Sequence, residues 1–328
     1  DYIVFYKLGI SLSSMEDTML MSYVLDAGKN RHNMDTLSGI HLGHKTISFK
    51  EIVGTGKKEI NFSEVELETA KNYAAEDADI TFRLYKKFLK SLKSEKLFNI
   101  YEIFEKPLIK ILAFMEIEGV EVDSKFLNSL SSKFDKKIKK IEKEVFKISK
   151  KEFNIASPKQ LGEIIYNDLK IAGTKKTKKG SFATSASVLE DLAFKGHEFP
   201  KLVLDWRQVS KLKNTYSDAL PEHINPHTKR VHTSFLLAAT TTGRLASSDP
   251  NLQNIPIKSE DGKDIRKAFK AKKDHLLVSA DYNQIEMRIL ADLADVKELK
   301  KAFKNNEDIH SLTASQIFNI DIKKVNQD

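Results

Sequence analysis

One stretch of the chain carries most of the information about its fold: Leu276-Leu277-Val278-Ser279-Ala280-Asp281-Tyr282-Asn283-Gln284-Ile285-Glu286-Met287-Arg288. The apolar residues at its start predict a buried strand, and the residues from Gln284 to Phe303 show the spacing of a helix. Asp281 follows the predicted strand directly, so its carboxylate is expected to be held at the sheet edge. Such a carboxylate suits Mg²⁺, which binds carboxylate oxygens together with substrate phosphates. A lone aspartate after a strand, however, is more often a turn or cap residue.

A second stretch lies upstream: Thr242-Gly243-Arg244-Leu245-Ala246-Ser247-Ser248-Asp249-Pro250-Asn251-Leu252-Gln253-Asn254-Ile255-Pro256. Between the two stretches lie Gly262 and Arg266-Lys267-Ala268-Phe269. In this order they resemble two palm motifs of the family A DNA polymerases of bacteria. The resemblance implies template-directed addition of deoxynucleotides to a primer 3′ end by two-metal phosphoryl transfer, in DNA replication and repair. It also implies two Mg²⁺ ions, primer–template DNA and deoxynucleoside triphosphates as partners, a monomer, and a place at the nucleoid in the bacterial cytoplasm.

The resemblance assigns roles to single residues of the first stretch. Asp281 and the backbone carbonyl of Tyr282 would bind the catalytic metals. Glu286 would lie against the incoming sugar and exclude a 2′-hydroxyl, although without the motif it would be interpreted as a surface helix glutamate. Gln284 is assigned to DNA binding.

The second stretch is expected to contact DNA. By resemblance, Arg244 and Gln253 reach the minor groove near the primer end, supported by Asn251 and Asn254. All base pairs present acceptors at similar places in that groove, so such contacts test pair shape rather than sequence. Lys258 stands where the family often has arginine, which retains the charge but not the bidentate fork.

A long basic amphipathic helix is predicted over 124–150, with a partner helix over 201–219. Their apolar stripes consist of Phe134, Ile138, Ile141, Val145 and Ile148 in the first and Leu202, Val203, Trp206, Val209, Leu212 and Tyr216 in the second. The loop-rich segment 170–187 between them contains Lys175, Lys176, Lys178 and Lys179. A lysine run by itself favours a solvated loop. Together with this lysine-rich segment, the pair of helices resembles the thumb of the family A polymerases, whose basic residues bind DNA phosphates.

The N-terminal part resembles a 3′–5′ proofreading exonuclease. Tyr73-Ala74-Ala75-Glu76-Asp77 looks like the third motif of that domain, on a helix predicted over 63–92 with Ser63 as its cap and Glu66 as capping-box partner. The motif is flanked by Asp17-Thr18-Met19-Leu20, Asn33-Met34-Asp35 and His44-Lys45-Thr46. The resemblance implies that Tyr73 orients the attacking water and that Asp77 holds a metal. Asp1 lies about where the aspartate of the second motif would be.

We therefore expect an α/β (α+β) helix-rich chain with a right-hand polymerase fold, containing the thumb and part of the palm. The C-terminal half of a ribonuclease H-like 3′–5′ exonuclease domain would precede them. The expected boundaries are 1–95 for the exonuclease-like part, 96–123 for a connecting helix and the start of the polymerase domain, 124–219 for the thumb, 220–295 for the first part of the palm and 296–328 for the start of the fingers. The connecting helix is predicted over 102–118, ending at Gly119.

Composition is consistent with this assignment but does not establish it. The chain has 328 residues, no cysteine and a net charge of +8, which indicates an acidic partner such as nucleic acid, or simply a lysine-rich surface. It lacks an initiating Met and motifs that the family places further on, the fingers helix and a His-Asp-Glu carboxylate. We therefore expect 1–328 to belong to a longer chain and to be inactive by itself, with an exposed apolar face at Ile3, Val4, Phe5 and Leu8. The alternatives are a duplex-DNA-binding remnant without catalysis and a dedicated 3′–5′ exonuclease.

Overall fold

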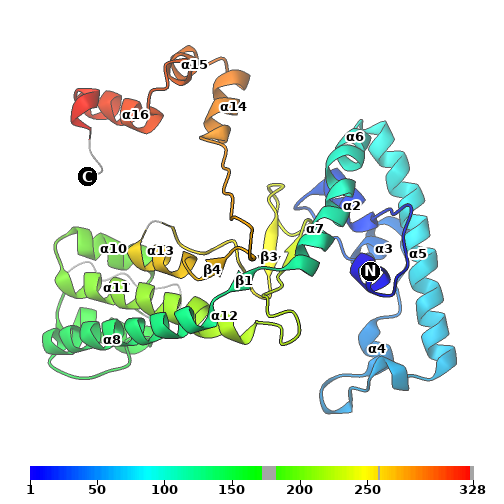
Figure 1. The fold of residues 1–328 in the computed structure, drawn as a ribbon, viewed down its shortest axis with the longest axis horizontal. Coiled ribbons are helices and arrows are strands. Elements are labelled where there is room, and N and C mark those ends of the chain that lie inside the picture. Colours follow the sequence, from blue (N-terminus) through cyan, green and yellow to red (C-terminus); the bar gives the residue numbers. More distant parts are fainter. Residues whose placement is uncertain (172–181, 258, 326–328) are drawn as a thin grey trace. The chain divides into compact units, whose positions relative to one another are not determined.

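The computed structural model describes residues 1–171, 182–257 and 259–325 (Figure 1). The chain divides into two compact units, Asp1–Asp274 and His275–Asp328. Helices dominate both units, and the strands among the described residues form two small antiparallel sheets. No helix in the described part of the chain is long and apolar enough to cross a membrane.

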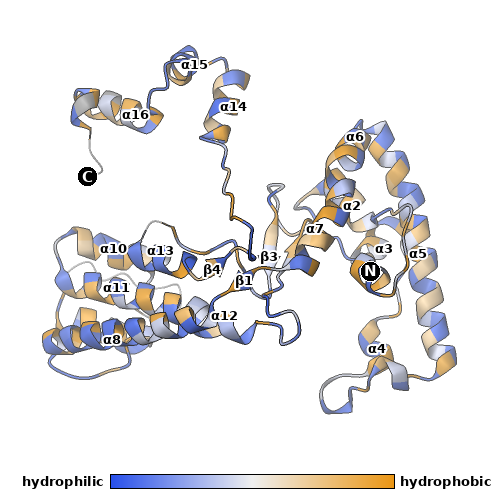
Figure 2. Ribbon diagram, in the orientation of Figure 1, coloured by the Kyte–Doolittle hydropathy of each residue, from blue (hydrophilic) through white to orange (hydrophobic). Residues whose placement is uncertain are grey.

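The first unit opens with a helical cluster that ends in one long helix. Its elements are α1 (Tyr2–Lys7), α2 (Thr18–Asp26), α3 (Met34–Leu42), α4 (Phe49–Val53) and α5 (Leu67–Ser94), with short 3-10 turns η1 (Gly56–Lys58) and η2 (Phe62–Glu64) before α5. Apolar residues from α2, α3 and α5 form a common core with Tyr101: Leu20, Met21, Leu37, Ile80, Leu84, Phe88 and Leu92. Figure 2 shows the corresponding alternation of hydrophobic and hydrophilic residues along α5.

The start of α5 differs from the prediction. Ser63 does not cap it; the side chain of Glu66 accepts hydrogen bonds from the backbone N–H groups of Glu68 and Thr69 instead. A capping box forms instead at the preceding 3-10 turn, η2, between Asn61 and Glu64. The predicted cap was wrong because the short turn at 62–64 satisfies its own backbone groups before the long helix begins.

The expected apolar face near the N-terminus is present. Val4, Phe5 and Leu8 are exposed, whereas Ile3 is half-buried. Tyr2 and Tyr6 of the same helix pack edge-on against Phe114 of helix α7 (Lys106–Glu118). Part of α1 is thus covered by the connecting helix and the rest contacts solvent.

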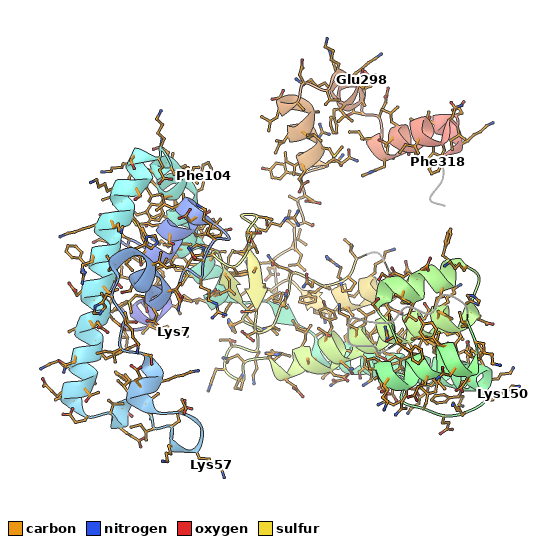
Figure 3. The ribbon with its side chains drawn as sticks, turned by 180° about the vertical axis from the view of Figure 1, so that it is seen from behind. Lys7, Lys57, Phe104, Lys150, Glu298 and Phe318 are labelled. Atoms are coloured by element: carbon orange, nitrogen blue, oxygen red, sulfur yellow. The ribbon has the colours of Figure 1, made fainter. Side chains whose placement is uncertain are left out.

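The connecting helix contains a π-helical turn. It consists of α6 (Phe98–Ile100), the π-helical turn η3 (Tyr101–Glu105) and α7 (Lys106–Glu118); Phe104 of η3 is exposed (Figure 3). The predicted stop at Gly119 is confirmed, with a φ of 63°. A Cβ there would lie 2.6 Å from the carbonyl oxygen of Val231, so the close approach of these two backbones also requires glycine.

The predicted helix pair is confirmed. α8 (Ser124–Ser149) packs against α11 (Glu198–Leu212) and the π-helical η5 (Lys213–Asp218) that continues it. Ser131 bonds to Asp218, and Trp206 donates to Glu142, so the two helices run antiparallel. Most of the predicted stripe is buried in one core, with Ile138, Ile148, Leu202 and Trp206 partly buried at its margin. The shorter elements α9 (Pro158–Glu163), η4 (Ile164–Asp168), α10 (Ala186–Phe194) and α12 (Ala219–Glu222) complete this part.

Two sheets connect these helical parts. β1 (Glu121–Val122) pairs with β4 (Phe269–Lys270), and β2 (Ser234–Leu236) pairs with β3 (Ala246–Ser248) in the register Phe235 to Ser247. Helix α13 (Glu260–Arg266) precedes β4. The alternation of residues 231–235 favours a strand, but the strand observed begins later, at Ser234, because Val231 is bridged to Val120 and Ile224 rather than to β3.

The second unit contains α14 (Ile285–Leu293), α15 (Lys297–Lys304), α16 (Ile309–Phe318) and the 3-10 turn η6 (Ile322–Lys324). The predicted buried strand at 276–278 is wrong: the exposed fractions of Leu276, Leu277 and Val278 are 88%, 63% and 87%. An apolar run becomes a strand only when it pairs with another, and within the described residues no strand pairs with it. The helix expected over 284–303 is interrupted at Asp295, whose φ is 48°.

Candidate functional site

Tyr73 and Asp77 lie one turn apart on α5, as predicted. Burial is the main reason that the pKa of the Tyr73 hydroxyl is raised, followed by the charge of the neighbouring Asp77 and the interaction of the two side chains. Burial raises the pKa of Asp77, an effect that the Tyr73 hydrogen bond opposes and that the nearby Asp35 and Glu76 carboxylates reinforce. One oxygen of Asp77, Oδ1, is buried without any hydrogen-bond partner. A buried carboxylate oxygen in this state has the chemistry of a cation ligand.

Glu76, next to Asp77, fixes the segment that faces this helix. Its Oε1 accepts a hydrogen bond from Nε2 of His44 at 2.7 Å, and its Oε2 accepts one from the backbone N–H of Ile47 at 2.7 Å. The Ile47 N–H is the main reason that the pKa of Glu76 is lowered, followed by the His44 side chain. In the same segment, Thr46 Oγ1 donates to Asp35 Oδ1 at 2.7 Å. Hydrogen bonds therefore connect Asp35 to the segment 44–47, and this segment to the helix that carries Tyr73 and Asp77.

Aromatic contacts hold the Tyr73 ring. Its centroid lies 6.1 Å from that of Phe49 on α4 and 6.2 Å from that of Phe62 in η2. Phe49 and Phe62 also stack on each other, with centroids 5.9 Å apart. These contacts restrict the direction in which the tyrosine hydroxyl can point.

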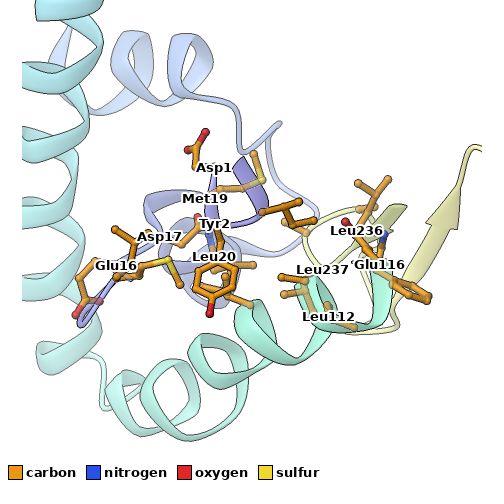
Figure 4. Close-up of a pocket in the computed structure, with 18 residues that line it drawn as sticks. Asp1, Tyr2, Glu16, Asp17, Met19, Leu20, Leu112, Glu116, Leu236 and Leu237 are labelled. Carbon is orange, nitrogen blue, oxygen red and sulfur yellow. Dashed lines mark hydrogen bonds between the residues drawn. The ribbon is translucent and has the colours of Figure 1, made fainter. Parts of the chain in front are cut away.

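Asp1 lies at a cavity of about 620 Å³ (Figure 4). The cavity is formed by α1, the segment before α2, α7 and the residues following β2, and Glu16, Asp17 and Glu116 also line it. Its remaining lining is largely apolar, including Leu20, Leu112 and Leu237. Across the described part of the chain, no group of three or more His, Asp or Glu residues is arranged to hold a metal ion. Of the residues expected to bind metal, Asp77 alone is supported, through its orphaned oxygen.

Residues 242–256, the segment predicted to contact DNA, are held by hydrogen bonds from side chains elsewhere in the first unit. Thr233 Oγ1 lies within 3.0 Å of Ser247 Oγ and of the carbonyls of Ser248 and Pro250. The Tyr216 hydroxyl donates to the carbonyl of Asn254, and Arg266 donates to the carbonyls of Ile255 and Pro256. The Asp249–Pro250 peptide bond, in a sequence typical of a turn, is cis.

The side chains predicted to bind DNA lie on the outer surface of this segment. Arg244, Asn251, Gln253 and Asn254 are all exposed. Arg244 precedes β3 and the other three follow it, so one short strand separates them. Asn251 Oδ1 accepts the N–H of Gln253 at 3.0 Å, which fixes the local turn.

In the second unit, Asp281 and Tyr282 are exposed ahead of α14. Gln284 adopts a left-handed conformation at the N-cap of α14, with Glu286 in its first turn. Arg288 donates from Nε to the carbonyl of Asn283 at 2.8 Å and lies over the Phe303 ring at 4.4 Å. Because no strand forms directly before Asp281 in the described residues, its carboxylate is not held at a sheet edge.

Some predicted residues cannot be placed, and some relevant ones were not predicted. Lys175, Lys176, Lys178, Lys179 and Lys258 lie outside the described residues. The roles of Glu76, Phe49 and Phe62 had no signal in the sequence beyond their nearness to quoted motifs, since their partners are 11 to 32 residues away. Tertiary packing alone brings them to Tyr73 and Asp77.

Comparison with known proteins gives consistent matches along the chain. The sequence pattern described as DNA polymerase family A matches residues 124–328, and that described as 3′–5′ exonuclease matches residues 1–93. DNA polymerase I of Rhizobium leguminosarum is 48% identical over 98% of this chain, which covers 32% of that relative. DNA polymerase I of Pseudomonas aeruginosa is 44% identical over 95% of this chain and 34% of the relative. The chain thus spans about a third of the length of these relatives.

A solved structure is also similar. The polymerase domain of Pol1 from M. smegmatis, in complex with DNA primer–template and dNTP, superposes with a TM-score of 0.83 at 31% sequence identity. The match covers 98% of this chain and 53% of that one.

Proposed function

The chain belongs to DNA polymerase family A, and from this premise we propose that it supplies the exonuclease-like part, the thumb and the first palm motifs of a DNA-directed DNA polymerase. The reaction is the addition of deoxynucleotides to a primer 3′ end in replication and repair. The observation that carries this proposal is the anchored segment 242–256, which presents four polar side chains to solvent from a fixed backbone.

The anchoring of that segment explains how it would act on DNA. Thr233, Tyr216 and Arg266 hold its carbonyl groups from the protein side, so its backbone does not need to become ordered when a duplex binds. Arg244 and Gln253 can then donate to minor-groove acceptors common to all base pairs, which makes the contact sensitive to pair geometry. Asn251 and Asn254 support the surface.

The roles of the second unit follow from the family. We assign Asp281 and the Tyr282 carbonyl to the metal ions, Glu286 to exclusion of a 2′-hydroxyl, and Gln284 to DNA contact. Two Mg²⁺ ions, when bound, would stabilise charge on the attacking and leaving oxygens. Deoxynucleoside triphosphates and primer–template DNA are the proposed substrates, bound by a monomer at the bacterial nucleoid.

The helix pair α8 and α11 is the proposed thumb. Contacts with phosphates would come from Lys175, Lys176, Lys178 and Lys179, and such contacts are independent of sequence and weakened by salt. We propose the domain boundaries 1–95, 96–123, 124–219, 220–295 and 296–328. The compact unit that ends at Asp274 differs from the proposed palm, which extends to residue 295.

The test uses two assays and two proteins. Purified 1–328 should bind a primer–template duplex, and Arg244→Ala should weaken this binding, as measured by fluorescence anisotropy. The whole product of the gene that encodes these residues should extend the primer with Mg²⁺, and Asp281→Asn should abolish extension without changing duplex binding. Duplex binding without any extension by the whole product would instead favour a DNA-binding remnant.

A 3′–5′ exonuclease activity in the same protein is the second proposal, favoured by the unpartnered Asp77 Oδ1 beside Tyr73. Tyr73 would orient the attacking water, and Asp77, with Asp1 by resemblance, would hold a metal ion. Mn²⁺ should raise the melting temperature of 1–328 but not that of Asp77→Ala, because a ligand that binds only the folded state stabilises it. Equal shifts in both proteins would contradict a cation site at Asp77.

A further inference from the structure

We propose that Tyr23, in the exonuclease-like part, is a positioning residue for the turn that presents Arg244 to DNA. The turn, residues 237–245, joins β2 to β3 and is called here the Arg244 turn. The inference rests on the proposed DNA contact of Arg244. It adds that the exonuclease-like core fixes the geometry of this contact.

The Arg244 turn is closed by its own hydrogen bond and held by one from outside. Thr240 Oγ1 donates to the carbonyl of Arg244 at 2.8 Å. The backbone N–H of Gly243 donates to the Tyr23 hydroxyl at 3.0 Å, across 220 positions of sequence. Gly243 has a φ of 77°, a conformation that glycine adopts at low cost. The Tyr23 hydroxyl therefore accepts the backbone N–H of Gly243, the residue directly before Arg244.

Tyr23 is itself held firmly. Its side chain is 4% exposed on α2, and its ring meets His32 edge-on at a centroid distance of 5.5 Å. His32 is buried as well, with Nδ1 2.9 Å from Ser22 Oγ. Since α2 packs along α5 in the same core, the phenol hydroxyl is an acceptor in a fixed position.

Further contacts between the same two parts support this arrangement. Leu237 and Ala238, at the start of the turn, pack against the core of α2, α3 and α5. A Cβ on Gly28, just after α2, would lie 2.7 Å from Cγ2 of Thr241, so the Thr241 side chain packs directly against this glycine. On the other side, the Glu116 carboxylate of α7 accepts the N–H of Phe235 at 2.6 Å, which anchors β2 where the turn begins. Figure 1 shows this hairpin beside α7.

A functional consequence follows from these contacts. Arg244 has a flexible side chain, so the precision of its approach to a groove depends on its backbone. Without the Tyr23 hydroxyl, the exposed Gly243 N–H would bond to water, and the turn would adopt several conformations. Binding would then require ordering of the turn, which weakens affinity. The duplex would be bound less tightly through Arg244, while other contacts would stay unchanged.

The first experiment compares Tyr23→Phe with a matched control. Tyr85→Phe removes a tyrosine hydroxyl from α5, against the same core. Binding of 1–328 to a primer–template duplex is measured by anisotropy, with and without Arg244→Ala. Tyr23→Phe should raise Kd roughly two- to tenfold, the range for loss of one neutral hydrogen bond. In the Arg244→Ala background it should have no further effect, because the two residues act as one unit. Tyr85→Phe should bind like the unmodified chain.

The second experiment perturbs the contact from the other side. Gly28→Ala places a methyl group against Thr241 at a φ of 81°, whereas Gly9→Ala places one in open space at a φ of 74°. Both variants have similar backbone strain, but only Gly28→Ala should weaken duplex binding and accelerate hydrogen–deuterium exchange over 239–246. The unfolding midpoint of each variant checks that it is folded.

The outcomes separate this inference from the function on which it rests. An unchanged Kd in Arg244→Ala would overturn the proposed DNA contact, and the positioning role with it. Weakened binding in Arg244→Ala, with Tyr23→Phe and Gly28→Ala both binding normally, would overturn the positioning role alone. Full additivity of Tyr23→Phe with Arg244→Ala would also overturn it, since Tyr23 would then act by another route.

Discussion

The carboxylate of Glu76 accepts the backbone N–H of Ile47 at 2.7 Å, so one side chain of α5 holds a segment from 29 positions earlier. The same carboxylate accepts a hydrogen bond from His44. Asp77, the next residue, has the unpartnered oxygen proposed to bind a cation. Glu76 therefore links the position of the 44–47 segment to the helix that carries Tyr73 and Asp77.

Glu76→Ala should release that segment. Hydrogen–deuterium exchange at Ile47 should accelerate, because its N–H loses its acceptor. Asp79→Ala, on the same helix, removes a carboxylate with an exposed partner, Arg83, and is the control. Protection of 44–48 that is equal in the two variants would show that Glu76 does not hold the segment.

The effect of Glu76 should depend on pH. Its pKa is lowered in the folded chain by the Ile47 N–H and the His44 side chain. A carboxyl with a lowered folded pKa stabilises the fold above its unfolded pKa, and this contribution is lost as the pH falls through the folded value. The melting-temperature difference between the unmodified chain and Glu76→Gln should therefore be larger at pH 7 than at pH 3. A difference that grows toward low pH would contradict this assignment.

Asp77 should show the opposite dependence. Burial raises the pKa of Asp77 in the folded chain. Its contribution to the free energy of unfolding is therefore most favourable below the unfolded pKa and is lost as the pH rises through the folded pKa. Asp77→Asn, which has no charge to bury, should raise the melting temperature more at pH 8 than at pH 4 in metal-free buffer. Asp79→Asn, an exposed aspartate two residues on, is the control and should show no such trend.

The thumb core should be sensitive to truncation. Phe134 is 0% exposed in α8, so Phe134→Ala should lower the free energy of unfolding by about 3–5 kcal/mol in urea titrations. Phe194 of α10 is 93% exposed, and Phe194→Ala should change the same quantity by less than about 0.5 kcal/mol. Similar losses in the two variants would mean that α8 does not pack as described.

The lysine-rich segment should control the salt dependence of DNA binding. Replacing Lys175, Lys176, Lys178 and Lys179 by alanine should flatten the slope of log Kd against log salt by about 0.9 for each phosphate that the protein no longer neutralises. The charge-matched control replaces Lys50, Lys57, Lys58 and Lys90, all exposed in the exonuclease-like part. An equal change of slope in the two quadruple variants would indicate a general charge effect rather than binding by the thumb.

The polypeptide 1–328 is expected to bind primer–template without extending it. Asp281 is exposed and, in the described residues, belongs to no cluster of three acidic or histidine side chains that could hold a metal. Gel-based extension with Mg²⁺ and all four deoxynucleoside triphosphates is the assay, with Asp281→Asn as the background control. Extension above that background would contradict the expectation.

Local sequence patterns by themselves determined the helices, the family and most of the candidate residues. The apolar spacing of 124–150 and 201–219 predicted two helices that pack together, because a stripe at intervals of three and four can only be buried against another element. Gly119 predicted the end of α7, and the spacing of Tyr73 and Asp77 put them on one helix face. Two long motifs in order identified the polymerase family.

Tertiary structure decided which long-range partners each of these residues meets. The run at 276–278 looked like a strand, but an apolar pattern does not supply the neighbouring strand that its backbone groups need. The partners of Glu76, the aromatic support of Tyr73 and the bond from Gly243 to Tyr23 join residues up to 220 positions apart. Local periodicity contains no information on such pairs, because they arise only when separate elements pack into one core.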